Sequence, residues 1–155
     1  MMTGMNLQLL TLLVQLVSAT LMTGVIWYVQ VVTYPQFLNI GESSFRAYHE
    51  NYSLRVSLIV IPPMLLELVA SLLGVVLFWS SPELRGWMVV GAVVTVSVWL
   101  CTFVIQVPLH TQLSNGFSEA AVKSLVRTNW IRTTLWTAHC GIVIVALYQY
   151  LKAPE

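Results

Sequence analysis

Hydrophobic residues gather in four long runs along the chain, and a short polar segment separates each run from the next. A transmembrane helix needs about 20 consecutive, mainly apolar residues. The runs cover about residues 7 to 33, 56 to 79, 87 to 107 and 130 to 151. The segments between them carry Tyr34-Pro35, Ser81-Pro82, Pro108 and Asn115-Gly116, which are typical of turns. The pattern predicts an all-α protein, an integral membrane four-helix bundle with up-and-down topology, in which residues 1–155 form a single domain.

The sequence around the runs refines the expected helix boundaries. Residues 41 to 44 offer serines that can cap a helix, and residues 45 to 55 are amphipathic, so the second helix is expected to begin near Phe45. A short helix is expected near residues 118 to 126. Pro62-Pro63 should kink the second helix, because proline lacks a backbone N–H. The expected transmembrane helices cover about residues 7–33, 45–79, 87–107 and 128–151.

The composition agrees with a membrane protein and excludes several other classes. Hydrophobic residues make up 57% of the chain and charged residues only 8%, against about 25% charged residues in soluble domains. A formal net charge of +1 provides no basic field for nucleic acid. Cys101 and Cys140 both lie inside apolar runs, which excludes a disulfide framework. No Lys or Arg precedes the first run and no cleavage pattern follows it, so we interpret it as a retained helix.

The basic residues indicate an orientation in the membrane. We call side B the membrane side that holds the end of the first helix, the start of the second, the end of the third and the start of the fourth. Side B has Arg46, Arg55, Lys123, Arg127 and Arg132, and the other side has Arg85 and Lys152. Counting only residues in the loops, the ratio is three to two. Because basic residues are enriched in cytoplasmic loops, we expect both termini outside the cytoplasm, in a bacterial inner membrane.

Polar residues recur at helical spacing inside three of the four runs. A polar stripe in a transmembrane helix must face other helices, since an unpaired polar group in hydrocarbon costs several kcal/mol. All three stripes end on side B, where His49 and Tyr52 begin the second helix. The stripes are Thr23, Trp27, Gln30 and Tyr34; Trp99, Thr102, Gln106 and His110; and Asn129, Arg132, Trp136 and His139 or Cys140. This convergence predicts a pocket near side B.

His49 and His110 are candidate catalytic residues or metal ligands at similar depth near side B. Imidazole binds iron, copper and zinc, and it accepts protons near neutral pH. Two histidines alone do not complete a metal site, so a bound iron, copper or haem and a purely hydrogen-bonded pair both remain open. Arg132 is the preferred contact for an anionic substrate group, with extension to the interface as the alternative. The candidate substrate-binding residues are Tyr34, Trp27, Gln106, Asn129 and Trp136.

Glu67 is the one acidic residue deep in an apolar run, and a lone carboxylate there must be neutral or paired. It lies 18 residues after His49, which corresponds to about 27 Å along a straight helix, so the two cannot share a metal. His139 lies at a matching depth in the fourth helix. We predict a buried Glu67–His139 pair, which would serve either proton transfer or metal ligation, or the packing of two helices.

Several segments together resemble a bacterial family of short four-helix integral membrane proteins of uncharacterised function. The segments are residues 34–37, residues 45–49, Pro63-Met64 with Glu67, residues 106–110 and residues 129–133. That family is distantly similar to the anthrone oxygenase-like membrane proteins, through Pro108, His110, Leu113 and Trp130. The polar residue after the proline is often asparagine in those proteins, and His139 stands where arginine is expected. The resemblance implies oxidation of a flat, apolar, quinol-like or polycyclic substrate inside the membrane.

Three functional hypotheses follow from the sequence. The first is a membrane oxidoreductase or oxygenase that takes a small apolar molecule from the lipid bilayer, with a histidine as base and Arg132 stabilising the oxyanion. The second is a transport protein for protons or a small solute, built around Glu67 and His139, which would need a homo-oligomer to enclose its path. The third is a non-catalytic assembly partner whose polar stripes serve only helix packing.

Overall fold

The structure is a computed structural model that describes residues 7–152, so the ends of the predicted domain 1–155 lie outside the described residues. Helices form from almost every described residue, and this part of the chain contains no strand. The elements in chain order are α1 (Leu7–Tyr28), the π-helix η1 (Val29–Thr33), α2 (Tyr34–Gln36), the 3-10 helix η2 (Phe37–Asn39), α3 (Glu42–Leu77), α4 (Pro82–Cys101), the π-helix η3 (Thr102–Gln106), α5 (Val107–Ser114) and α6 (Glu119–Lys152).

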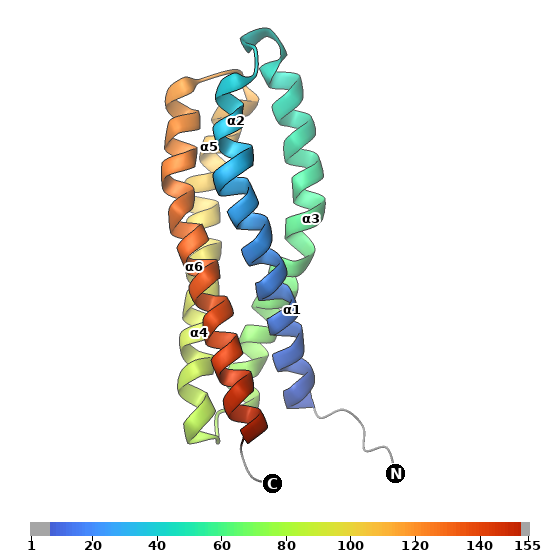
Figure 1. The fold of residues 1–155 in the computed structure, drawn as a ribbon, viewed down its shortest axis with the longest axis vertical. Helices are drawn as coiled ribbons and strands as arrows, with labels where there is room; N and C mark the ends of the chain where they lie inside the picture. The colour runs from blue at the N-terminus through green and yellow to red at the C-terminus, as the bar shows by residue number, and fades with distance from the viewer. Residues whose placement is uncertain (1–6, 153–155) are drawn as a thin grey trace.

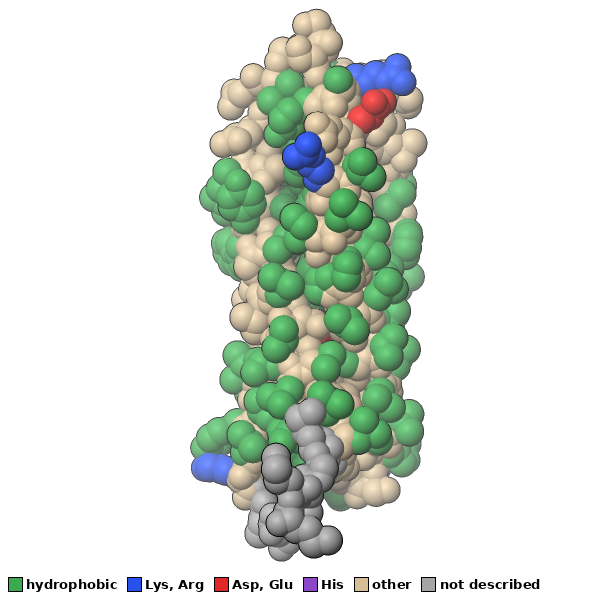
Figure 2. Space-filling view, turned by 90° about the vertical axis from the view of Figure 1, so that its right-hand side faces the viewer, with side chains coloured by type: hydrophobic (Ala, Val, Ile, Leu, Met, Phe, Trp, Pro, Cys, Tyr) green, Lys and Arg blue, Asp and Glu red, His purple; other side chains and the backbone are tan. Residues whose placement is uncertain are grey.

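These elements join into four long helical segments that run up and down, as Figure 1 shows. Each segment is long and apolar enough to cross a membrane, and the segments cover Leu7–Asn39, Glu42–Leu77, Pro82–Ser114 and Glu119–Lys152. Helix α1 packs against α3 and α6, and α4 packs against the same two helices from the other side. Figure 2 shows hydrophobic side chains over the middle of the face that carries α3, with Lys and Arg near its ends. The predicted all-α four-helix bundle is confirmed.

Two of the predicted helix ends differ from the structure because a π-helical turn precedes a proline. The N–H of Tyr34 bonds to the carbonyl of Val29, and the N–H of Val107 bonds to that of Thr102. Each widened turn ends just before Pro35 or Pro108, which then stands in the first turn of α2 or α5, where its missing N–H is tolerated. The first and third helices therefore continue beyond residues 33 and 107, toward side B.

The remaining boundaries also extend past the apolar runs. Helix α3 begins at Glu42 rather than near residue 45, and it continues through Pro62-Pro63 to Leu77. Helix α4 begins at Pro82 rather than near residue 87, because proline is well placed in a first helical turn. The expected short helix near residues 118–126 is the beginning of α6. The Ser118 hydroxyl accepts a hydrogen bond from the backbone N–H of Ala121 at 3.3 Å and caps this helix.

The bundle interior is divided into layers along its long axis. An upper polar layer, near side B, contains Gln30, Tyr34, His49, Gln106, His110, Asn129 and Arg132. A lower polar layer contains Gln15, Glu67, Ser71, Thr95 and His139, each at most 2% exposed. Between them lies an apolar layer of Met22, Ile26, Met64, Val98 and Trp136, which pack into one buried cluster. Each of the four long segments contributes to all three layers.

Candidate functional site

Four polar side chains form a continuous hydrogen-bonded chain in the upper polar layer, which we call the histidine relay. The Tyr34 hydroxyl lies 3.0 Å from Nε2 of His110, and Nδ1 of His110 lies 3.0 Å from Nε2 of His49. Nδ1 of His49 then lies 3.3 Å from the Ser114 hydroxyl. The two imidazole rings are stacked, with their centroids 5.2 Å apart. The π-helical turns before α2 and α5 carry Tyr34 and His110 past the apolar runs and into this layer.

The hydrogen bonds of the histidine relay all have the same direction when both imidazoles are neutral. Ser114 donates its hydroxyl proton to the carbonyl of His110 at 3.0 Å, so it must accept from Nδ1–H of His49. His49 then accepts from Nδ1–H of His110. His110 in turn accepts from the hydroxyl of Tyr34 through its remaining nitrogen. The donors of the histidine relay therefore run from Tyr34 through His110 and His49 to Ser114.

Arg132 is buried beside this relay, and within residues 7–152 it has no carboxylate partner. The residue is only 6% exposed, so its guanidinium does not extend to the interface. One nitrogen donates to the side-chain oxygen of Asn129 at 3.2 Å, and Asn129 donates to Gln30 at 2.9 Å. Arg132 also interacts electrostatically with Tyr34. Its Nε has no hydrogen-bond partner within the described residues. A buried guanidinium with a free donor favours an anionic or carbonyl ligand.

A cavity of about 500 Å³ lies in front of Arg132. Tyr34, Gln106, His110 and Arg132 provide polar groups, and the rest of the wall is mainly apolar. At the mouth stand Ile61 of α3 with Phe103 and Val107 of the third segment, and these three residues are 47%, 60% and 45% exposed. The mouth therefore opens sideways between α3 and the third segment, toward the region that lipid would occupy. Volume and lining suit a small apolar ligand.

The predicted site residues divide into three groups. Tyr34, Gln106, His110 and Arg132 line the cavity, as the convergence of the stripes predicted. His49 and Asn129 lie behind this wall and bond to His110 and Arg132. Two of the predicted substrate-binding residues do not line the cavity: Trp27 and Trp136. Trp27 is 42% exposed and donates to Thr137 at 3.0 Å, whereas Trp136 belongs to the apolar layer.

The histidine pair matches a metal site poorly. The structure contains no group of three or more His, Cys, Asp or Glu residues that could hold an ion within residues 7–152. Protein metal sites usually provide three or four such ligands, and His49 and His110 provide two. All four of their ring nitrogens already have hydrogen-bond partners. Coordination of iron, copper or haem by either histidine would break one of these hydrogen bonds.

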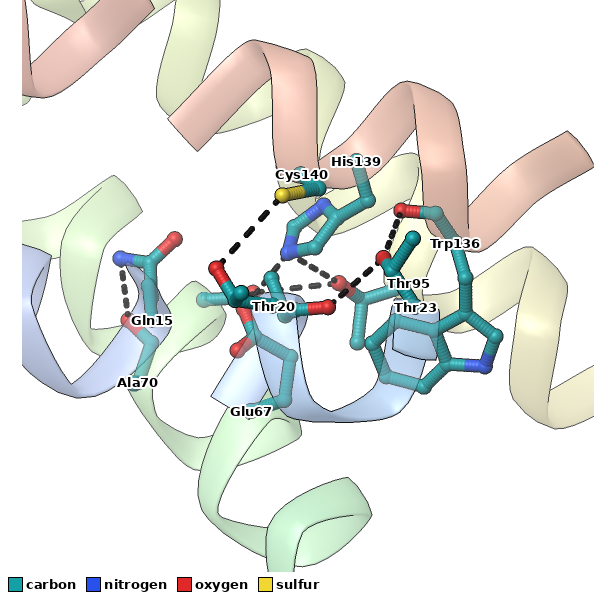
Figure 3. Close-up of polar contacts among 11 residues, drawn as sticks. Gln15, Thr20, Thr23, Glu67, Ala70, Thr95, Trp136, His139 and Cys140 are labelled. Atoms are coloured by element: carbon teal, nitrogen blue, oxygen red, sulfur yellow. Dashed lines mark hydrogen bonds and ion pairs between the residues drawn. The ribbon is translucent and has the colours of Figure 1, made fainter. Parts of the chain in front are cut away.

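The lower polar layer contains the predicted pair, and this prediction is confirmed. Nε2 of His139 lies 2.6 Å from Oε1 of Glu67, and both side chains are fully buried. Ser71 donates to the same carboxylate oxygen at 3.1 Å and bonds to Thr95 at 3.1 Å. Figure 3 shows these contacts joining α3, α4 and α6. The pair lies on the far side of the apolar layer from the histidine relay, and among the described residues no side-chain hydrogen bond joins the two polar layers.

Sequence reasoning missed Ser114 and Ser53. Ser114 follows His110 by one helical turn, and this spacing of four residues is a usable signal once the third helix is known to continue past Pro108. Ser53 lines the cavity from α3, and its hydroxyl is buried without a partner in the described part of the chain. No feature of the sequence distinguishes it from the other serines of that helix.

Comparison of the chain with protein-family models, with curated proteins and with solved structures gives no match. The geometry of the cavity and of the histidine relay therefore carries the functional argument.

Proposed function

We propose that the protein is a membrane-embedded oxidoreductase that takes a small, flat, apolar molecule with an acidic hydroxyl group from the bilayer. The observation that carries this proposal is the Nε of buried Arg132, which has no partner among the described residues, at an apolar cavity whose wall also holds Tyr34, His110 and Ser114 of the histidine relay. Such a cavity accepts an aromatic ring, and Arg132 balances the negative charge that forms when the hydroxyl loses its proton. A quinol is the simplest molecule with these properties.

The proposed first step is removal of the substrate's hydroxyl proton. Tyr34 accepts this proton while passing its own to Nε2 of His110, and His110 passes its Nδ1 proton to Nε2 of His49. His49 then holds the proton as an imidazolium whose Nδ1–H donates to Ser114. Arg132 stabilises the resulting anion. The anion is more easily oxidised than the neutral quinol, and dioxygen is the proposed oxidant. One quinol and one dioxygen give one quinone and one hydrogen peroxide: the two electrons of the quinol reduce dioxygen, and its two hydroxyl protons, one of them returned by the relay, end in the peroxide.

The test of anion stabilisation uses 1-naphthol, a flat apolar phenol whose anion absorbs at longer wavelength than its neutral form. The protein in lipid nanodiscs at pH 7 should increase the absorbance of the anion. Arg132→Gln should reduce the bound anion by at least about tenfold, which corresponds to the loss of about 1.4 kcal/mol. Arg127→Gln removes a neighbouring charge of the same helix that does not line the cavity, and it should behave like the wild type. Equal anion absorbance in Arg132→Gln would contradict the proposal.

A cofactor is tested separately, by absorbance spectroscopy and elemental analysis of the purified protein. The proposed step uses only side chains of this chain, so iron and copper should be far below one equivalent and no Soret band should appear. If the purified protein contained a stoichiometric metal that was lost in His49→Ala or His110→Ala, the two histidines would be ligands of a redox centre rather than members of a proton relay.

The same proposal places the protein in a bacterial inner membrane, with side B in the cytoplasm and both termini outside. The support is the excess of basic residues at the side B ends of α3 and α6. The cavity lies within one chain, so a homo-oligomer is not required. Proton or solute transport through a single chain is less well supported, because the apolar layer separates the two polar layers. An assembly partner would not need a buried guanidinium whose Nε has no partner among the described residues.

A further inference from the structure

A second hollow lies on the outer side of the bundle, where α1 and α3 diverge. This groove has a volume of about 820 Å³ and is lined on the α1 side from Thr20 to Thr33. The thirteen helical steps from Thr20 to Thr33 correspond to about 20 Å, so the groove is somewhat longer than one leaflet of a hydrocarbon core about 30 Å thick. Its deep end is mainly apolar, around Leu21, Gly24 and Ile59.

The end of the groove near side B is polar and basic. Tyr28, Tyr48, Asn51 and Arg55 line it, and Tyr28 and Tyr48 are 63% and 40% exposed, as expected for an aromatic belt at headgroup level. Nε of Arg55 donates to Asn51 at 2.7 Å, which holds the guanidinium in place. No carboxylate pairs with Arg55 in residues 7–152, and no acidic residue lines the groove. Arg55 is therefore a cation without a carboxylate partner among the described residues, and it lies where the polar end of the groove meets its apolar part.

We infer that this groove binds one anionic phospholipid, with its phosphate on Arg55 and an acyl chain along the face of α1 that contains Gly24. Arginine suits phosphate because its planar guanidinium donates two parallel hydrogen bonds. Gly24 leaves room for the chain, since a Cβ atom built there meets nothing within 4 Å. This inference is independent of the proposed function. Tyr52 and Val56 line both the groove and the cavity, so the bound lipid would contact the wall that encloses the ligand.

Native mass spectrometry of the full-length protein in detergent tests this inference. The probes are phosphatidylglycerol and phosphatidylcholine with identical acyl chains, and the ratio of retained lipid is measured. We expect the anionic lipid to be favoured about fivefold, the factor that one basic residue contributes at a membrane surface. Arg55→Gln should bring this ratio close to one, whereas Arg85→Gln, which changes an arginine at the opposite end of the bundle, should leave it unchanged.

Gly24→Leu fills the groove and should reduce retention of both lipids. Gly141→Leu is the matched control, because a Cβ atom there also meets nothing within 4 Å and Gly141 does not line the groove. Equal retention of the two lipids by the wild type, or an unchanged ratio in Arg55→Gln, would overturn the inference. A dimer that carries no lipid and dissociates in Gly24→Leu would also overturn it, since the groove would then hold a second copy of the chain.

Discussion

Replacing His139 with alanine is expected to lower the free energy of unfolding by about 3 kcal/mol, the loss typical of a buried ion pair with one partner removed. The substitution leaves the Glu67 carboxylate fully buried without its partner at 2.6 Å. It also opens space above Gly91, where an added Cβ atom would lie 3.5 Å from the His139 ring. Titration with sodium dodecyl sulfate in mixed micelles, followed by circular dichroism, measures the change.

Two further variants separate the charge from the packing. Cys140→Ala alters the next residue of α6, whose thiol makes a weak 3.7 Å contact with the hydroxyl of Thr20, and it should cost less than about 1 kcal/mol. The double variant Glu67→Met with His139→Leu removes both polar groups, so it should be more stable than His139→Ala alone. A double variant that is less stable than His139→Ala would show that the loss arises from packing rather than from the unpaired carboxylate.

Replacing His110 with alanine is expected to lower turnover by about 10²- to 10⁴-fold, the usual contribution of a general base. The reason is that His110 is the histidine that accepts from the Tyr34 hydroxyl, at 3.0 Å. Turnover is measured as oxygen consumption with 1,4-naphthoquinol in nanodiscs, after subtracting the rate in empty nanodiscs. The circular dichroism spectrum of each variant shows whether it is folded.

Tyr34→Phe provides the sharper test of the relay. It keeps the aromatic ring that packs on Phe37 and His110 but removes the hydroxyl that links the cavity to His110. We expect a loss similar to that of His110→Ala. Because the two residues act in one chain, the double variant should be no slower than the slower single variant. Losses that multiply in the double variant, or full turnover in His110→Ala, would contradict the relay.

The amino-acid sequence was sufficient to predict the bundle and the pairing of Glu67 with His139. Hydropathy alone determines the four runs, because lipid excludes polar side chains from the outer surface of a span. The depth of a residue within a span can be counted at about 1.5 Å per residue. Glu67 and His139 have matching depths by this count, and they lie 2.6 Å apart in the structure.

The continuation of the first and third helices toward side B could not be predicted from the sequence. Pro35 and Pro108 are typical of helix ends, and a π-helical turn leaves no mark in the hydropathy pattern. The convergence of polar stripes correctly placed Tyr34, Gln106, His110 and Arg132 around one cavity. It could not exclude Trp27, because the rotation of a helix about its axis depends on packing with its neighbours. The oxidoreductase activity itself stays a prediction.

The apolar layer of Met22, Ile26, Met64, Val98 and Trp136 separates the two polar layers and would also block proton movement between them. Hydrogen-bonded groups conduct protons, whereas a buried plug of hydrocarbon and indole does not. A proton held by the histidine relay would therefore not reach the Glu67–His139 pair, although that pair lies only a few helical turns away. Because oxidation of a quinol by dioxygen leaves both hydroxyl protons in hydrogen peroxide, chemistry in such a cavity would neither build nor discharge the proton gradient across the membrane.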